Sequence, residues 1–167
     1  LESAGAVATG KLVQLSEQQL LDCDDPEEFA CCGGDETDAI DWMKKTGTGL
    51  TLEAEYPYLK EYGEDRDRDY CQQPVKHSCA NTEGKEVTTV SGHFRVSAGD
   101  VKEIKAALNK YGPLTASLDA SSLNSYPFGK DPIMLEAPDK CEDVDHAVVL
   151  VGYGSEDGVD YWRVRNS

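Results

Sequence analysis

Two side chains near the end of the sequence, His146 and Asn166, have the chemistry of a proton-transfer site. A histidine imidazole titrates near neutral pH, so it can act as a general base and then as a general acid. A carboxamide can hold such a ring in one orientation by hydrogen bonding to one of its nitrogens. We interpret the pair as the base and the orienting residue of a Cys-His-Asn catalytic set. The alternative for His146 is a buried structural histidine in a strand.

A β-hairpin is the element that must bring these two residues together. Residues 147–151 are apolar and mostly β-branched, which predicts a buried strand that starts beside the histidine and ends at the Gly-Tyr-Gly of residues 152–154. A polar turn at residues 155–158 follows, and residues 159–164 alternate well enough to pair back along the first strand. The return strand would then bring the carboxamide towards the level of the imidazole.

Several blocks of the sequence resemble motifs of the papain-like cysteine peptidases, the family of papain and the lysosomal cathepsins. Segments 144–154 and 161–167 resemble the family's histidine and asparagine blocks. Residues 15–23 resemble its Leu-Ser-Glu-Gln-x-Leu-x-Asp-Cys segment, and residues 31–34 resemble its Cys-x-Gly-Gly. With Tyr-Pro-Tyr at residues 56–58, these blocks come in the family's order and cover nearly the whole chain.

The resemblance implies an α+β fold of two lobes. A mostly helical lobe would occupy approximately residues 1–85, and a lobe resembling an antiparallel β-barrel approximately residues 86–167. The family's nucleophile lies in Cys-Gly-Ser-Cys-Trp, and Leu1 would fall about nine residues after that cysteine. The Trp-Gly that usually follows the asparagine block would come after Ser167. We therefore expect an internal fragment of one papain-like peptidase domain, incomplete at both ends.

The activity that the resemblance implies is peptide-bond hydrolysis through a Cys-His-Asn site and an acyl-enzyme. His146 would exchange the proton and Asn166 would orient its ring. The backbone of Gly34, after Gly33, would hydrogen-bond the substrate like a strand, since glycine lets another backbone approach closely. Because the nucleophile would lie outside these residues, we expect the fragment alone to be inactive. The alternative is a catalytically dead papain-like homologue that acts as a binding or structural protein.

A specificity pocket is also implied by the resemblance. Its expected lining residues are Ser117, Val144 and Ala147, and Asp145 is a further expected substrate-binding residue. Ser117 is small and polar, and Asp35 and Glu36 depart from the aromatic or apolar residue often found after the family's glycine pair. We expect these departures to favour a basic or polar substrate side chain two residues before the bond that is cut.

Six cysteines in a chain of this length favour disulfides over a zinc site, because no Cys-x-x-Cys pair is matched to another. A cytosolic chain with free thiols is the alternative. The resemblance implies a bridge from Cys23 to Cys71, and we pair the two cysteines left over, Cys32 and Cys79, with each other. Two further cysteines match family positions whose partners would lie outside these residues: Cys31 and Cys141.

Composition excludes several classes of partner. The chain has 16 Lys and Arg against 32 Asp and Glu, a formal charge of -16, which argues against nucleic acid and anionic membranes. No apolar run approaches the roughly 18 residues of a membrane span. The acidic residues form either a solvated surface or a patch that recruits basic substrates. The acidic loop at residues 60–70 lacks the spacing of an EF-hand, so we expect neither a metal nor a cofactor.

Partners and location follow from the resemblance. We expect protein or peptide substrates, a propeptide or a cystatin-like inhibitor as a further partner, and a monomer. A charge that would shrink at low pH suits a lysosomal, vacuolar or extracellular protein.

Periodicity and end signals predict the remaining elements. Helices are expected at residues 1–8, 16–23, 37–45 and 100–111, a strand at residues 114–119, and an exposed connection at residues 120–140. Ser16 and Gln19 fit a capping box, in which each satisfies an amide of the other. Strands of the second lobe are expected within residues 86–96. His77 and His93 are interpreted as surface or structural histidines.

Overall fold

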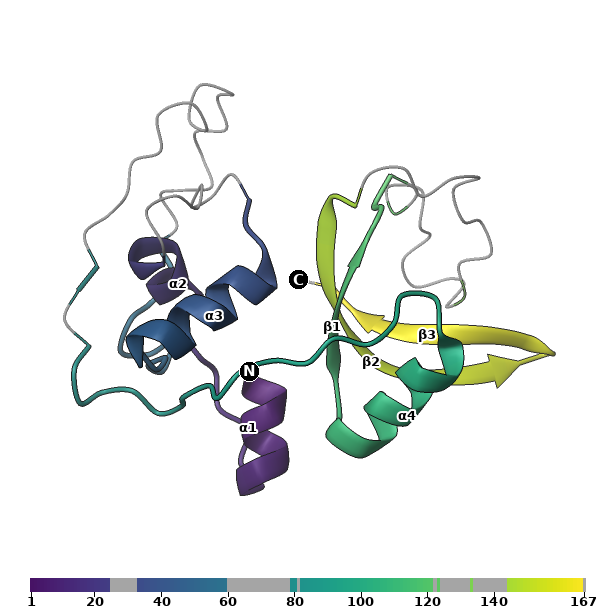
Figure 1. Cartoon of the computed structure of the whole chain (residues 1–167), viewed down its shortest axis with the longest axis horizontal. Helices are drawn as coiled ribbons and strands as arrows, with labels where there is room; N and C mark the ends of the chain where they lie inside the picture. Colours follow the sequence, from purple (N-terminus) through teal and green to yellow (C-terminus); the bar gives the residue numbers. More distant parts are fainter. Residues whose placement is uncertain are drawn as a thin grey trace. The chain divides into compact units, whose positions relative to one another are not determined.

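The computed structural model divides the chain into two compact units, Leu1–Arg95 and Val96–Ser167. It describes residues 1–24, 33–59, 79–80, 82–121, 123, 133 and 144–166. The first unit contains helices α1 (Glu2–Thr9), α2 (Glu17–Cys23) and α3 (Glu36–Thr46). The second contains helix α4 (Val101–Tyr111) and strands β1 (Leu114–Leu118), β2 (His146–Glu156) and β3 (Val159–Arg165), as Figure 1 shows. The lobe boundary that we expect near residue 85 stays a prediction.

The helices expected from periodicity are confirmed to within one or two residues at each end. Helix α1 ends at Gly10, whose φ of 74° is left-handed and whose N–H donates to the Ala6 carbonyl at 2.8 Å. Helix α3 ends in the same way at Gly47, where φ is 73°. The N-cap of α4 is Asp100, whose carboxylate accepts from the amide of Glu103 at 3.0 Å.

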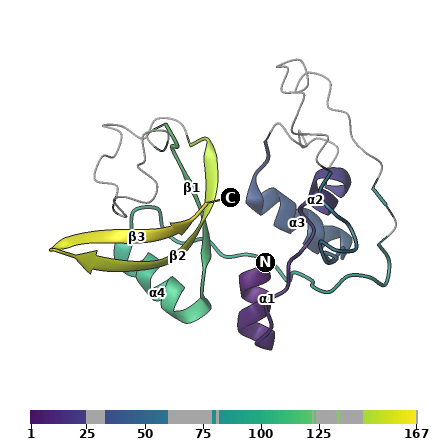
Figure 2. The same ribbon diagram turned by 180° about the vertical axis from the view of Figure 1, so that it is seen from behind.

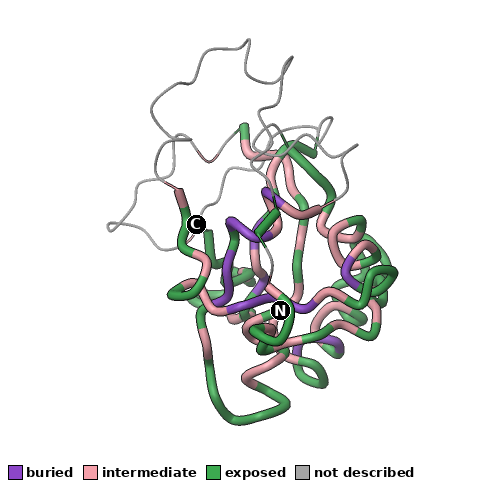
Figure 3. The backbone as a smooth tube through the Cα atoms, turned by 90° about the vertical axis from the view of Figure 1, so that its left-hand side faces the viewer, coloured by how far each residue is buried: buried purple, intermediate pink, exposed green. Residues whose placement is uncertain are grey.

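The apolar core of the first unit is small. Met43 of α3 is 1% exposed and packs with Leu15 and Leu50, which come from the segments before and after the α2–α3 region. The buried positions of the chain are purple in Figure 3. Partly buried apolar residues surround this cluster: Val13, Leu20, Trp42 and Val90. Buried polar residues lie beside this cluster as well: Ser16, Gln18, Gln19, Asp22 and Thr51.

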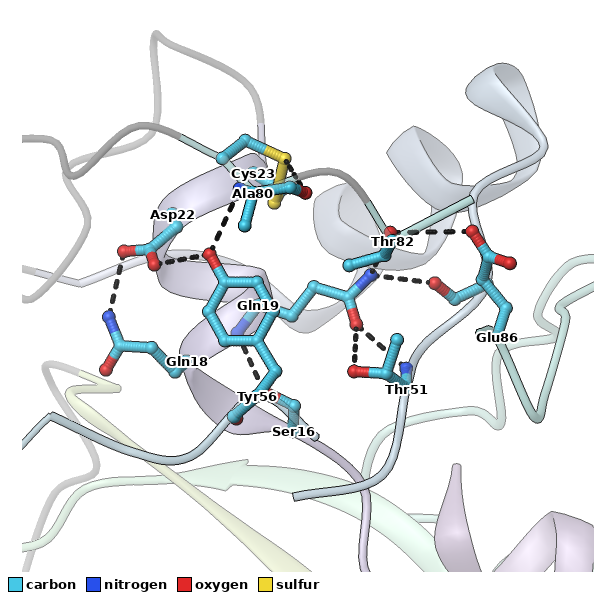
Figure 4. Close-up of a disulfide and its surroundings, with 12 residues drawn as sticks. Ser16, Gln18, Gln19, Asp22, Cys23, Thr51, Tyr56, Ala80, Thr82 and Glu86 are labelled. Carbon is cyan, nitrogen blue, oxygen red and sulfur yellow. Dashed lines mark hydrogen bonds between the residues drawn. A yellow bond between two sulfur atoms is a disulfide. The ribbon is translucent and has the colours of Figure 1, made fainter. Parts of the chain in front are cut away.

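Those polar groups gather around α2, and Figure 4 shows how they lie. Ser16 is the N-cap: its hydroxyl accepts from the Gln19 amide at 3.0 Å and donates to the Tyr56 carbonyl at 2.7 Å. The expected capping box is therefore half right. The Gln19 side chain does not reach back, because the Ser16 amide donates instead to the Thr51 carbonyl at 3.0 Å.

Gln19 uses its carboxamide to tie α2 to the strand-like segment after α3. Its Nε2 donates to the Gly49 carbonyl at 2.9 Å, and its Oε1 accepts from the amide and hydroxyl of Thr51 at 2.8 and 3.1 Å. The side chain is completely buried. Gly49 has to be glycine, since a Cβ there would lie 2.1 Å from the Thr88 carbonyl oxygen. The segments therefore meet backbone to backbone at this point.

The Tyr-Pro-Tyr block is held on the other side of α2. Gln18 donates through Nε2 to Asp22 at 2.8 Å and accepts from the Leu59 amide at 3.0 Å. Tyr56 donates its hydroxyl to the second Asp22 oxygen at 2.7 Å. Partial burial, and then this hydrogen bond, raise the pKa of Tyr56. The Leu-Ser-Glu-Gln block is thus the polar centre of the first unit.

One disulfide joins Cys23, the last residue of α2, to Cys79. The expected pairs Cys23–Cys71 and Cys32–Cys79 are therefore wrong. The structure also gives the reason: the amide of Ala80 donates to the Tyr56 hydroxyl at 3.4 Å, and that hydroxyl is itself bound to Asp22, so residue 79 is held beside the end of α2. The spacing of the cysteines in the sequence does not indicate this contact between Tyr56 and Ala80.

We expect a non-reducing peptide map of the full-length protein to link the peptides that carry Cys23 and Cys79, because the contacts of Tyr56 with Asp22 and Ala80 place these two cysteines side by side. Mass spectrometry of the digest with and without reductant measures this directly. A Cys23 peptide joined to Cys71 would restore the pairing that the family motifs imply.

Some expectations fall outside the described residues. These are the cysteines 31, 32, 71 and 141, the histidine at position 77, the acidic loop at residues 60–70 and most of the connection at residues 120–140.

The expected strands within residues 86–96 are wrong. Thr88 makes only an isolated bridge with Leu50, and residues 86–95 belong to the first unit. Further along the segment the contact is with α3 and not with another strand, since His93 Nδ1 lies 3.5 Å from Asp41 Oδ1. This contact agrees with a structural role for His93.

The second unit is an antiparallel sheet in the order β1-β2-β3, with β2 in the centre (Figure 2). Helix α4 packs against β1 and β2. Its buried residues are Ala107 and Leu108, and those of β2 are Val148 and Leu150. The strand expected at residues 114–119 and the hairpin of residues 147–164 are confirmed.

The expected end of the hairpin's first strand at Gly152 is wrong, because β2 continues to Glu156. The register shifts between Leu150 and Gly152, and pairing then resumes with Gly152 opposite Arg163 and Tyr153 opposite Trp162. Gly154 gives room to the ring of Tyr161, since a Cβ at this position would lie only 2.5 Å from the Tyr161 Oη. Glycine here serves close packing across the strands and not a turn.

Candidate active site

His146 is the first residue of the central strand, so its backbone is fixed from one side by β1. It lies opposite Leu118, and the preceding amide, that of Asp145, donates to the Leu118 carbonyl at 3.2 Å. The Asp145 carboxylate also accepts from the Ala120 amide at 2.8 Å. These two contacts fasten the entry to β2, and the imidazole is presented half-buried at the strand's beginning.

Asn166 directly follows β3, and the hairpin brings it beside the histidine. The distance from His146 Nε2 to Asn166 Oδ1 is 3.0 Å. Because a carboxamide oxygen only accepts, this contact places a proton on Nε2. The other ring nitrogen, Nδ1, is then the one that can take up or release a proton. The hairpin thus positions the His146 ring so that Nε2 is hydrogen-bonded to Asn166 and Nδ1 is left for proton exchange.

A nucleophile is the group that this pair would need to form a covalent intermediate. Within the described part of the chain, the cysteines are Cys23 and Cys79, and both are consumed by the disulfide. A disulfide sulfur has no thiolate to attack a carbonyl. Across the same described ranges, no group of three or more His, Cys, Asp or Glu side chains could hold a metal ion.

Gly33 and Gly34, the expected substrate-backbone residues, are exposed and lead directly into α3. Gly33 has a φ of 130°, which an L side chain rarely adopts, so glycine is required at this position. Asp35 is the N-cap of α3, and its carboxylate accepts from the Thr37 amide at 2.7 Å. The glycine pair is therefore an exposed backbone segment without side chains, and it directly precedes the N-cap of α3.

Of the expected pocket residues, the structure brings Ser117 and Ala147 together. They lie directly opposite each other on β1 and β2, and both are exposed. Val144, two residues before the histidine, is 60% exposed. Ser117, Val144, Asp145 and Ala147 thus surround the beginning of β2 in the second unit, whereas Gly33, Gly34 and Asp35 belong to the first.

Sequence reasoning missed the N-cap role of Asp35. The signal was present, because an aspartate stood immediately before the helical stripe. It also missed Arg95, whose Nη2 donates to the Thr37 hydroxyl at 3.1 Å. The two residues are 58 positions apart, and no local pattern connects them.

Comparison with known proteins agrees with this geometry. The model of the papain family cysteine proteases matches residues 1–167. Digestive cysteine proteinase 2 of Homarus americanus is 36% identical over 168 residues, covering 100% of this chain and 47% of the relative. Cathepsin S of Mus musculus is 32% identical over 170 residues, covering 100% of this chain and 45% of the relative.

Among solved structures, digestive procathepsin L 3 from the larval midgut of Tenebrio molitor matches with a TM-score of 0.75 and 30% identity, covering 96% of this chain and 47% of that one. The α+β arrangement is therefore part of a papain-like fold. This chain belongs to the papain family of cysteine proteases. It spans about half the length of the relatives it matches. None of the helices in the described ranges is long and apolar enough to cross a membrane.

Proposed function

We propose that the protein to which this chain belongs is a cysteine-type endopeptidase that uses His146 and Asn166 as the base and the orienting residue of a Cys-His-Asn site. The observation that carries the proposal is the 3.0 Å contact between His146 Nε2 and Asn166 Oδ1. Membership of the cysteine protease family supplies the reaction class. The nucleophilic cysteine comes from a part of the protein outside residues 1–167.

The reaction proceeds in two halves. His146 Nδ1 takes the proton of the thiol, and the thiolate attacks the scissile carbonyl carbon. The imidazolium then gives this proton to the leaving amine, the C–N bond breaks, and a thioester remains. In the second half Nδ1 takes a proton from water and the hydroxide adds to the thioester carbon. The C–S bond then breaks, the carboxylic acid product leaves, and the proton returns from Nδ1 to the sulfur to regenerate the thiol. Asn166 keeps the ring aligned through both transfers.

Substrate binding falls to the remaining expected residues. The exposed backbone of Gly34 aligns the substrate chain, and Ser117, Val144, Asp145 and Ala147 surround the side chain two residues before the cut. Asp35 favours a basic or polar side chain there only modestly, because its carboxylate already accepts from Thr37. Hydrogen bonds from the same helix end lower the pKa of Asp35 and keep it ionised.

Partners and location are proposed from the relatives. Solved neighbours include procathepsins and digestive enzymes, which supports a propeptide and protein substrates for this protein too. A cystatin-like inhibitor, a monomeric state and a lysosomal, vacuolar or extracellular location complete the proposal.

The test compares the full-length protein with residues 1–167 alone, using a dipeptidyl fluorogenic substrate and a thiol-directed epoxide. We expect turnover by the full-length protein that the epoxide abolishes, with the label on a cysteine outside residues 1–167. We expect no turnover by the shorter chain, because His146 and Asn166 supply only proton transfer and orientation.

Two outcomes would contradict this. Turnover by the shorter chain that the epoxide abolishes would place the nucleophile among its own cysteines. A full-length protein with neither turnover nor labelling would be a papain-like binding or structural protein.

A further inference from the structure

Three side chains at the beginning of α3 form a chain of hydrogen bonds, which we call the α3 relay: Asp35, Thr37 and Arg95. Arg95 Nη2 donates to the Thr37 hydroxyl at 3.1 Å. That hydroxyl donates in turn to the Asp35 carboxylate. The same Asp35 oxygen accepts from the Thr37 amide at 2.7 Å.

The donors and acceptors of the relay fit together chemically. A guanidinium only donates, a carboxylate only accepts, and a hydroxyl has one proton to give and lone pairs to receive. The Thr37 hydroxyl can therefore bridge the two charged groups, because it accepts a hydrogen bond from Arg95 and donates one to Asp35. The hydrogen bonds from the Thr37 hydroxyl and amide, and then the Arg95 charge, lower the pKa of Asp35 and so favour its ionised form, the form that accepts both hydrogen bonds.

The position of the relay gives it a consequence beyond α3. Asp35 follows Gly34 directly, and its extended backbone (φ −109°, ψ 131°) sets the direction in which the glycine pair leaves the helix. Two consecutive glycines have the greatest conformational freedom of any dipeptide, so an exposed pair has little of its own to hold it. The fixed position of Asp35 therefore limits the conformations of the Gly33–Gly34 backbone and raises the fraction of time that it is extended and able to pair with a substrate strand.

We propose that Arg95 is a positioning residue for substrate binding, which through Thr37 and Asp35 holds the Gly33–Gly34 backbone in the direction that aligns the peptide. The inference rests on the proposed function, in which Gly34 binds the substrate backbone. Arg95 touches no substrate. It acts on the segment that does.

A purely structural role for the relay would have a small effect. Arg95, Asp35 and Gly34 are all exposed, and a hydrogen bond between exposed groups contributes little to folding, because water competes for both partners. The buried contacts of Met43 and Gln19 hold α3 and its neighbours without Arg95. Loss of the guanidinium should therefore leave the fold intact and change only the alignment of the glycine segment.

The experiment uses Arg95→Ala and Thr37→Val in the full-length enzyme, with two substrates. A dipeptidyl amide engages the backbone site, whereas nitrophenyl acetate has no peptide backbone and reports only the nucleophile and His146. We expect both variants to lower kcat/KM on the dipeptide about tenfold, mainly through KM, and to leave ester turnover within about twofold. Arg95→Lys, which keeps a charged donor, should restore part of the loss.

Two controls separate this from general damage. Lys45→Ala removes an exposed cation from the other end of α3 and should leave the turnover of both substrates unchanged. The double variant of Arg95→Ala and Thr37→Val should be no worse than either single one, because both break the same relay.

Equal losses on the dipeptide and the ester, or no loss on either, would overturn the inference while leaving the proposed function standing. A wild-type protein that turns over neither substrate would overturn both.

Discussion

Replacing His146 by alanine in the full-length peptidase will lower kcat/KM on a dipeptidyl substrate by about three to four orders of magnitude. Without the imidazole no group takes the thiol proton, and the leaving amine departs without protonation. The residual rate would come from substrate binding and from stabilisation of the tetrahedral intermediate. Steady-state kinetics, with active sites counted by the epoxide, measure the change.

Asn166→Ala should have a smaller effect, about tenfold to a hundredfold, since it removes the 3.0 Å contact but leaves the base in place. Its loss should appear mainly in kcat, because the ring then spends less time in the productive orientation.

His93→Ala is the matched control for His146. It removes another imidazole from the same chain, one whose Nδ1 lies 3.5 Å from Asp41 and which has no part in the proposed reaction. Its kcat/KM should stay near the wild-type value. A His146→Ala enzyme with more than about a tenth of wild-type activity would show that another group takes the proton, and the catalytic assignment would fail.

Local elements of this fold were predictable because their signals are local. The αL glycines after α1 and α3 and the aspartate cap of α4 each act within one helical turn, and the structure confirms all of these helices. The hairpin was predictable for the same reason, since its turn joins neighbouring strands. The pattern also placed Asn166 near His146, and they lie 3.0 Å apart, while their catalytic role remains a proposal.

Contacts between distant segments were not predictable in this way. The strand was expected to end at Gly152, yet it continues to Glu156 in register with β3, and Tyr161 of β3 packs over Gly154. Cys79 was assigned to the wrong partner because the contact that places it runs through Tyr56 and Asp22. Gln19 fitted a capping box locally, but Gly49 and Thr51 offered buried groups with which its carboxamide forms hydrogen bonds. In each case a tertiary partner overrode the local preference.

Gln19 also carries the second large expected effect: Gln19→Leu will lower the free energy of unfolding by about 3–5 kcal/mol. Leucine fills a similar volume but can neither donate nor accept. The Gly49 carbonyl loses its donor, and the Thr51 amide and hydroxyl lose their shared acceptor, at a site where Gln19 and Thr51 are at most 1% exposed. A buried polar group without a partner costs about 1–3 kcal/mol.

Gln14→Leu is the matched control, because it makes the same chemical change at an exposed position a few residues earlier, before α2 begins. Its effect should stay within about 0.5 kcal/mol. Urea unfolding of the full-length protein, followed by the fluorescence of Trp42 beside the core, measures both variants. Thr51→Val should cost less than Gln19→Leu, and the double variant should cost less than the sum of the two, because both changes break the same hydrogen bonds. A Gln19→Leu protein as stable as Gln14→Leu would mean that water replaces the lost partners, and that the apolar cluster around Met43 holds the first unit without help from the Leu-Ser-Glu-Gln block.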